Sequence, residues 1–292
     1  MTIAAHLGVL DEVGLIRPCI DHLRNIGVDE FIVCDMGSTD GTAEILRSEE
    51  GKDFKILWSS NEEPGDVWLR RNTEAVATSR ASWIVLLDAD EFPLPAGGDL
   101  RRALASFDAQ IVEVPRFNVV QGPAGLHMPM RLSPENYASV ELYVKSDPDF
   151  RKKLAVDTTL YWLRFVPVPK VIVRPAVVRQ LKYGMHDIIP KEGVPVRRVA
   201  ASNIVTAHVA LSDFDRFARK LDNVRDMYRL HEGQLPPNFA WHWRRWVELA
   251  DQGDLRKEFD RSILSHSDLA ALRADGTIRS AAMMLDPRNG GC

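Results

Sequence analysis

Short apolar runs alternate with helical patterns along the first hundred residues. Four runs have the length of a buried strand: Ile3–Leu10, Phe31–Cys34, Lys55–Trp58 and Trp83–Leu87. The segments between them, about 15–26, 43–48 and 66–80, repeat apolar residues at helical spacing, and Gly27 stands where the first helix should end. Strands that alternate with helices in this way predict an α/β fold with a mainly parallel central sheet flanked by helices.

The pattern changes after about residue 110. Residues 111–210 are richer in proline and contain two further strand-like runs, Ile111–Val114 and Lys170–Val173. From Ser212, a residue that can cap a helix, the chain is predicted to be helical and includes a tryptophan-rich segment at 241–246. We therefore divide the chain into residues 1–110 and 111–210, as two halves of one domain, and a helical C-terminal extension at 211–292.

The composition is that of a globular protein without a bias toward a polyanionic partner. Of the 292 residues, 45% are hydrophobic and 27% charged, and 37 Lys and Arg against 41 Asp and Glu give a formal net charge of -4, which argues against nucleic acid as a partner. Three scattered cysteines (Cys19, Cys34 and Cys292) are too few for a disulfide framework. No apolar run approaches the ~20 residues of a membrane span, and the N-terminus lacks the basic region of a signal peptide. We expect a cytoplasmic protein without a transmembrane segment.

Acidic residues follow three of the predicted strands. Asp11 and Glu12 follow the first strand, Asp35 follows the second, and Asp88 and Asp90 follow the fourth. Because ligands of open α/β sheets bind beyond the carboxyl ends of the strands, these carboxylates are expected to converge on one site. Their hard oxygen atoms suit Mg²⁺ or Mn²⁺, which in turn bridges phosphate oxygens, so a nucleoside diphosphate is the natural ligand.

Each acidic cluster also has a purely structural explanation. The segment Asp35–Thr42 has the composition of a turn followed by a helix cap, and Asp11-Glu12 could cap the first helix. An Asp-x-Asp pair after a strand is by itself a weak signal. The three clusters together, in this order and at these spacings, favour the nucleotide site.

Four segments carry a resemblance to a known family. They are Leu10-Asp11-Glu12, Gly27–Phe31, Asp35–Thr42 and Trp83–Phe92. Over about the first 95 residues the chain resembles glycosyltransferases of the GT-A fold, in particular family 2-like enzymes, in the branch that carries an Asp-x-Asp-Glu-Phe motif. A weaker similarity continues through Lys170–Pro175, Tyr183–His186 and Ala207–Lys220.

The resemblance implies a nucleotide-sugar site in residues 1–110, with residues 111–210 on the acceptor side. It assigns Asp35 to the base of the nucleotide, usually uracil, and Asp11 and Glu12 to the nucleoside pocket. Family members usually carry an asparagine at the position of Asp11, so this chain departs from the pattern at that contact. Arg71 matches a basic position that approaches the nucleotide.

The resemblance also implies a divalent metal ion, Mn²⁺ or Mg²⁺. Asp90 would bind it directly, Asp88 would contact the ribose or the metal's water shell, and a late histidine would complete the site, for which we take His186 ahead of His208. The general base that an inverting transferase needs is assigned to Asp187, because this residue adjoins His186. The other carboxylates that could act as the base are Glu141, Asp147 and Asp157.

These expectations combine into a metal-dependent glycosyltransferase that moves a sugar from a nucleotide-sugar, usually a UDP-sugar in this family, to an acceptor hydroxyl in glycan or polysaccharide assembly. The resemblance implies inversion at the anomeric carbon, and retention, which some relatives of the GT-A fold show, stays open as the alternative. The acceptor is a glycan, a lipid-linked or a small molecule, and the tryptophan-rich segment is compatible with peripheral membrane contact. Two alternatives stay open. A sugar nucleotidyltransferase should carry a glycine-rich phosphate loop after the first strand, which is missing, and a non-catalytic nucleotide-sugar-binding relative is disfavoured by the intact Asp88 and Asp90.

Overall fold

A seven-stranded sheet forms the centre of the computed structural model, which describes residues 1–60, 62–157, 159–230 and 241–289. From edge to edge its strands are β14 (Arg198–Ala200), β6 (Ile111–Val114), β11 (Lys170–Val173), β4 (Trp83–Asp88), β1 (Ile3–Val9), β2 (Glu30–Asp35) and β3 (Phe54–Trp58). β1 pairs in parallel with β2 and β4, and β2 with β3, whereas β11 runs antiparallel to β4 and β6. The predicted α/β class with a mainly parallel central sheet is confirmed.

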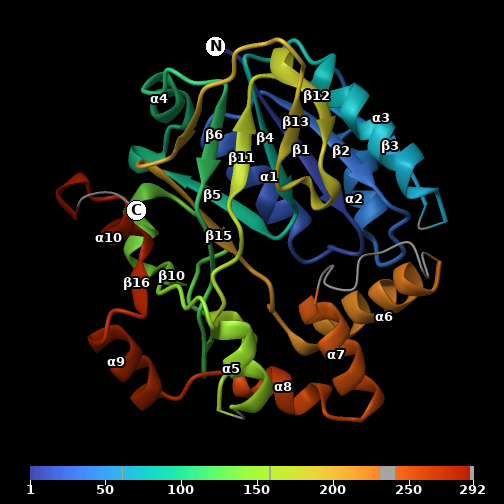
Figure 1. The fold of residues 1–292 in the computed structure, drawn as a ribbon. Coiled ribbons are helices and arrows are strands. Elements are labelled where there is room, and N and C mark those ends of the chain that lie inside the picture. The colour runs from blue at the N-terminus through green and yellow to red at the C-terminus, as the bar shows by residue number, and fades with distance from the viewer. Residues whose placement is uncertain (61, 158, 231–240, 290–292) are drawn as a thin grey trace.

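Both faces of this sheet are covered (Figure 1). One face carries α1 (Ile16–Asn25), α2 (Thr42–Glu49) and α4 (Leu100–Ala105), and the other carries α3 (Gly65–Ala77) with the hairpin of β12 (Val178–Leu181) and β13 (Ile188–Pro190). The side chains of β1 alternate between these two layers: Ile3, Ala5 and Leu7 pack into the cluster of α1, and Ala4 packs into that of α3. A strand buried on both faces requires the near-continuous apolar sequence seen in β1 and β4.

Local sequence patterns predict the bounds of these elements closely. The structure contains the two strand runs at Ile111–Val114 and Lys170–Val173 with unchanged bounds. Gly27, with φ +100°, follows α1 in the left-handed conformation that glycine adopts most easily. Cys19 and Cys34 are buried free thiols, and Cys292 lies outside the described residues.

A smaller sheet brings the segment after β4 against a late part of the chain. It consists of β5 (Glu91–Pro95), β15 (Ile204–His208) and β7 (Arg116–Asn118), in the order β5-β15-β7. In its register His208 lies opposite Glu91 on one side and Asn118 on the other. This pairing carries His208 to the acidic turn that follows β4.

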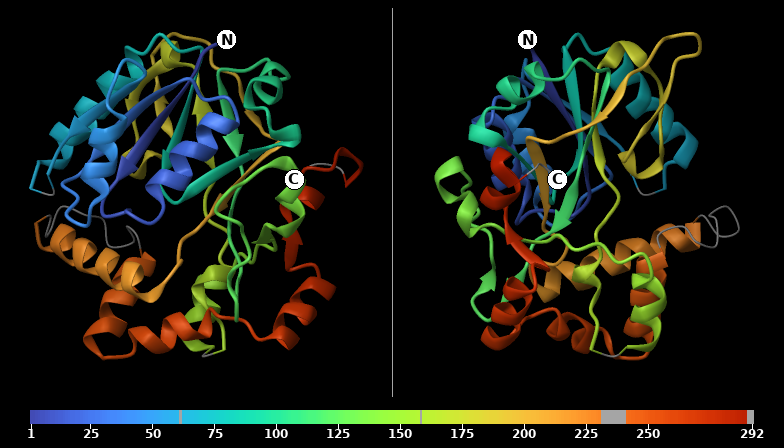
Figure 2. Two further views of the ribbon diagram at one scale, coloured as in Figure 1. Left: turned by 180° about the vertical axis from the view of Figure 1, so that it is seen from behind. Right: turned by 60° about the vertical axis from the view of Figure 1, so that its left-hand side comes forward.

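The C-terminal part is helical, as predicted, and lies beyond the carboxyl ends of the central strands (Figures 1 and 2). Its helices are α6 (Phe214–Leu230), α7 (Trp241–Asp251), α8 (Leu255–Arg261), α9 (His266–Ala274) and α10 (Ala281–Met284). Two details differ from the prediction. The side chain of Asp213, rather than Ser212, accepts from the first turn of α6, and a short strand, β16 (Ile278–Ser280), pairs with β10 (Glu141–Tyr143).

The remaining elements pack around these helices. They are α5 (Phe150–Val156) and the two-residue strands β8 (Gln121–Gly122) and β9 (Gly125–Leu126). A separate apolar cluster joins α5 to α6, α7 and α8 through Phe150, Phe217, Trp246 and Phe259. Among the described residues, no helix has the length and apolar character needed to cross a membrane.

Candidate active site

Parallel pairing aligns the ends of β1, β2 and β4. Gly8 lies opposite Asp88, and Val9 lies opposite Asp35, so both acidic residues reach the same edge of the sheet. Asp11 follows within two residues of the end of β1. The convergence expected from the sequence is therefore present, at the edge that α6 covers.

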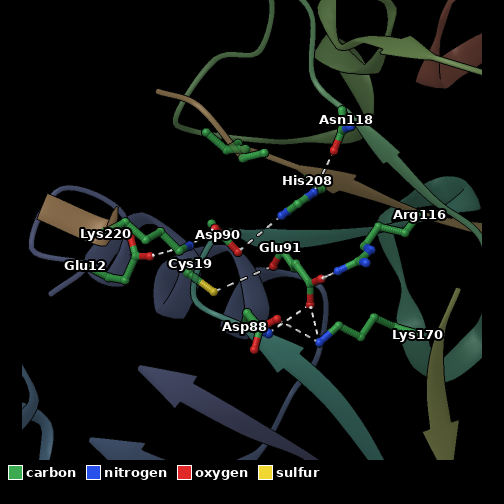
Figure 3. A network of polar contacts seen from close by, with 12 residues as sticks. Glu12, Cys19, Asp88, Asp90, Glu91, Arg116, Asn118, Lys170, His208 and Lys220 are labelled. Carbon is green, nitrogen blue, oxygen red and sulfur yellow. Dashed lines mark hydrogen bonds and ion pairs between the residues drawn. The ribbon is translucent and has the colours of Figure 1, made fainter. Parts of the chain in front are cut away.

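The turn after β4 is held by a buried glutamate (Figure 3). The backbone N–H of Asp88 donates to Glu91 Oε2 at 2.8 Å, and the same carboxylate forms ion pairs with Arg116 and with Lys170, the latter at 3.2 Å. Lys170 Nζ also donates to Asp88 Oδ2 at 2.9 Å. Glu91 thus fixes the conformation of the turn, and Lys170 neutralises Asp88 from the neighbouring strand.

Asp90 is buried and faces two cations from α6. Arg216 Nη2 donates to Asp90 Oδ2 at 2.8 Å, and Lys220 Nζ donates to the same oxygen at 2.7 Å. Both cations also contact Glu12: Arg216 makes a bidentate pair at 2.6 and 2.7 Å, and Lys220 lies 3.2 Å from Oε1. Burial alone would raise the pKa of Asp90, but the positive charges of Lys220 and Arg216 hold it well below its ordinary value. Asp90 and Glu12 therefore anchor α6 to the edge of the sheet.

His208 presents a nitrogen lone pair to the other oxygen of Asp90. The amide of Asn118 donates to the backbone carbonyls of Leu163 (3.0 Å) and Phe165 (2.8 Å), so its Oδ1 must accept the 2.7 Å hydrogen bond from His208 Nδ1. Burial lowers the pKa of His208 well below its ordinary value, so the ring is neutral and its Nε2 carries no hydrogen. That nitrogen lies 3.7 Å from Asp90 Oδ1.

The Asp90–His208 pair is suited to a cation. Asp90 Oδ1 accepts no hydrogen bond from the described part of the chain, and the two lone-pair atoms face each other in a buried setting. A divalent ion that takes one carboxylate oxygen and one imidazole nitrogen fits this donor set. No group of three or more His, Cys, Asp or Glu side chains among the described residues could hold a metal ion, so two protein ligands are the set to consider.

The nucleoside end of the predicted site is ordered by side-chain contacts. Asp35 is buried, and its Oδ1 accepts from the hydroxyl of Ser38 at 2.5 Å. Asp11 has a φ of +55°, a strained value for a non-glycine residue, and its carboxylate accepts from the backbone N–H of Thr39 (2.7 Å) and the amide of Asn223 (2.8 Å). The unusual backbone of Asp11 is therefore stabilised by both the β2–α2 turn and α6.

Among the described residues, three other predicted side chains, those of Arg71, His186 and Asp187, make no hydrogen bond or ion pair with Asp90. Arg71 on α3 pairs with Glu63 at 2.6 Å and donates to the carbonyl of Trp58 at the end of β3. His186, between β12 and β13, makes no ion pair with Asp90; burial, followed by the charges of Lys170 and Arg116, lowers its pKa to about 3. The structure brings His208 to Asp90, and the assignment of His186 as a metal ligand stays a prediction.

Asp187 is engaged by cations of its own hairpin and of the sheet edge. Lys182 donates to its Oδ2 at 2.7 Å and Arg198 to its Oδ1 at 2.6 Å. Although partial burial opposes them, these contacts hold the pKa of Asp187 below its ordinary value. In this conformation the carboxylate is a weak proton acceptor, and its role as the general base stays a prediction.

The sequence analysis missed the four cations of the site. Lys170 had a visible signal, because a lone cation opens an otherwise apolar strand, Lys-Val-Ile-Val. Arg216 and Lys220 are four residues apart, which puts them on one face of a helix that was predicted at nearly its observed position. Arg116 had no comparable signal.

Comparison with known proteins identifies the family. Residues 9–155, just over half of the chain, match the family model described as glycosyl transferase family 2. The TPR repeat-containing protein Synpcc7942_0270 of Synechococcus elongatus is 29% identical over 196 residues, which span 65% of this chain and 44% of that protein. The chain therefore covers less than half the length of this curated relative.

Among solved structures, residues 1–349 of TarS from S. aureus align over 89% of this chain and 81% of theirs, with 12% identity and a TM-score of 0.38. Glucosyl-3-phosphoglycerate synthase from Mycobacterium tuberculosis aligns over 81% of each chain, with 16% identity and a TM-score of 0.37. The family model spans the strands and turns that supply Asp11, Asp35, Asp88 and Asp90. The chain belongs to glycosyl transferase family 2.

Proposed function

We propose that this protein is a metal-dependent glycosyltransferase that moves a sugar from a nucleotide-sugar, usually a UDP-sugar in this family, to an acceptor hydroxyl in glycan or polysaccharide assembly. Membership of glycosyl transferase family 2 supports the reaction class. The observation that carries the proposal for this chain is the arrangement of Asp90 Oδ1 and His208 Nε2, 3.7 Å apart at the carboxyl ends of the parallel strands. Buried lone pairs that face one another in this way are stabilised by a cation.

The donor is proposed to bind along the ends of β1, β2 and β4. Asp35 has one carboxylate oxygen held by Ser38, and its Oδ2 accepts no hydrogen bond from the described residues, which suits it to accept the N3–H of uracil. Asp11, Glu12 and Arg71 are proposed to border the nucleoside. Both carboxylate oxygens of Glu12 accept hydrogen bonds from Arg216 of α6, so the contribution of Glu12 at this border is to position that helix.

Asp90 and His208 are proposed to hold Mn²⁺ or Mg²⁺, with Asp88 in the outer shell. A bound divalent ion offsets the negative charge that develops on the departing diphosphate. Neighbouring residues of the chain would orient the two ligands: Asn118 fixes the tautomer of His208, and Glu91 fixes the turn that carries Asp90.

The acceptor side is proposed to supply the general base for an inverting transfer. Asp187 keeps this assignment, and to accept a proton it must exchange its contacts with Lys182 and Arg198 for the acceptor hydroxyl. A glycan, a lipid-linked or a small molecule is the proposed acceptor, and a cytoplasmic location with peripheral membrane contact remains our expectation.

The proposal is tested by following the release of nucleoside diphosphate from a panel of nucleotide-sugars. The wild-type protein should release UDP from at least one UDP-sugar, and both EDTA and the Asp90→Asn substitution should abolish this release. A sugar nucleotidyltransferase would instead consume pyrophosphate and release UTP. Binding of UDP without any turnover, with or without candidate acceptors, would identify a non-catalytic relative and refute the proposal.

A further inference from the structure

The carboxylates clustered around the turn after β4 are already balanced by cations without a ligand. Four carboxylates face four cations among the described residues, and each carboxylate has at least one cationic partner. They are Glu12, Asp88, Asp90 and Glu91 with Arg116, Lys170, Arg216 and Lys220. A divalent ion that entered alone would leave two uncompensated positive charges in a largely buried cluster, which is costly. The diphosphate of a nucleotide-sugar carries two negative charges, so the ion and the diphosphate together leave the charge balance of this cluster unchanged.

One of these four cations is free to change partners. The side chain of Lys220 is 26% exposed, whereas those of Lys170, Arg116 and Arg216 are 2%, 8% and 5% exposed. Among the described residues Lys220 pairs with two carboxylate oxygens, Asp90 Oδ2 and Glu12 Oε1, and its Nζ lies 5.8 Å from the centre of the Trp243 ring. None of these contacts has the fixed bidentate geometry of a guanidinium, and the ammonium group ends a flexible side chain.

Arg216, in contrast, is fixed. It bonds to both oxygens of Glu12, to Asp90, and to the carbonyls of Val209 and Ala210. When Lys220 leaves, Arg216 therefore still ties α6 to the sheet, so the exchange does not require the helix to detach.

We propose that the ammonium group of Lys220 neutralises Asp90 in the donor-free protein, as the metal ion does once it is bound. When the donor and the metal ion bind, Lys220 leaves Asp90 and pairs with the diphosphate of the donor. The ammonium group then neutralises the diphosphate from the side of α6, as a charge-assisted hydrogen-bond donor. This proposal rests on the proposed function, and it adds that metal and donor bind together rather than in sequence. Lys220 accordingly opposes the binding of metal alone and favours the binding of diphosphate.

The test is Lys220→Met, because the two roles predict effects of opposite sign. Calorimetry should show that the variant binds Mn²⁺ alone about tenfold more tightly than the wild type, since a like charge within a few ångströms has been removed. In the presence of Mn²⁺ it should bind UDP about tenfold more weakly, because a charge-assisted hydrogen bond to the diphosphate is lost. Its affinity for uridine, which has no phosphate, should be unchanged.

Two further variants serve as controls. Arg219→Met removes an equal charge from an exposed neighbouring position of α6 and should change none of the three affinities by more than about twofold. Lys220→Gln removes the charge but keeps a polar side chain beside Asp90, and it replaces Lys220→Met should the latter fail to fold.

Three results would overturn the proposal. An unchanged or weaker affinity of the Lys220 variant for Mn²⁺ alone would refute its place at Asp90, and an unchanged affinity for UDP would refute its transfer to the diphosphate. An equal loss for uridine and UDP would show that the residue only supports the fold of the site. If the wild type binds no nucleoside diphosphate at all, the proposed function fails as well.

Discussion

Removal of Arg216 should destabilise the protein more than removal of any exposed cation of α6. The guanidinium makes two charge-assisted bonds to Glu12, one to Asp90 and two to backbone carbonyls, all in a buried setting. Methionine fills a similar volume but carries no charge. Glu12, which is buried, would then keep Lys220 alone as a cationic partner among the described residues. Loss of one member of a buried pair costs about 3–5 kcal/mol, so we expect the free energy of unfolding to fall by about that amount.

The assay is urea denaturation of a double-mutant cycle. Arg216→Met and Glu12→Gln are measured singly and together, with Arg219→Met as an exposed control that should change stability by less than about 0.5 kcal/mol. Because Glu12→Gln removes the carboxylate that Arg216→Met strands, the double variant should lose at least about 1 kcal/mol less than the sum of the single losses. An additive cycle, or a loss below about 1 kcal/mol for Arg216→Met alone, would show that this contact does not hold α6 to the sheet.

Three further predictions concern individual side chains. Burial lowers the pKa of His22 in the folded protein to about 4, below the ordinary 6.5 of the unfolded chain, so its contribution is complete above pH 6.5 and is lost as the pH falls toward 4. Between pH 7 and pH 5 the free energy of unfolding should therefore fall by about 2 kcal/mol less in His22→Gln than in the wild type. The exposed control His266→Gln should behave like the wild type, and equal pH profiles for all three proteins would contradict the prediction. Asn118→Leu removes the acceptor that sets the tautomer of His208 and should weaken Mn²⁺-dependent binding of UDP about tenfold, with uridine binding unchanged; an unaltered UDP affinity would refute the tautomer argument. Asp187→Asn should lower the turnover number at least about a hundredfold while UDP affinity is retained, and near-normal turnover would remove Asp187 as the base.

The sequence predicts best those features that depend on residues adjacent in the chain, such as the strands and the turns that follow them. The apolar runs of β1, β4 and β6 and the acidic turns after the strands are local patterns, and parallel pairing then brings Asp35 and Asp88 to one edge without further information. The class of the fold, and the edge of the sheet at which these acidic residues converge, follow from these patterns.

The partners of the carboxylates could not be predicted in the same way. Asp90 contacts Arg216 across 126 residues of sequence, and Glu12 contacts Arg216 across 204. No feature of the sequence singles out this arginine as the partner of these carboxylates among the 37 Lys and Arg residues. A contact of that span is set by where α6 docks, which depends on the packing of the whole C-terminal part.

The choice between the two histidines has a similar cause. In the sequence His186 is favoured because it follows a strand-like run and precedes Asp187. His208 reaches Asp90 because β15 pairs with β5 in a register that puts His208 opposite Glu91. A shift of one residue in that ladder would turn the imidazole to the other face of the sheet. Sequence alone does not specify such a register.

The most direct test of the account is calorimetric titration of the wild-type protein with UDP, with and without Mn²⁺, beside the Asp90→Asn and His208→Gln variants. The account predicts that Mn²⁺ strengthens UDP binding to the wild type, and that each substitution removes this gain but leaves the weaker, metal-independent binding in place. UDP binding that is indifferent to Mn²⁺, or a gain that survives in either variant, would contradict the assignment of Asp90 and His208 as the metal site.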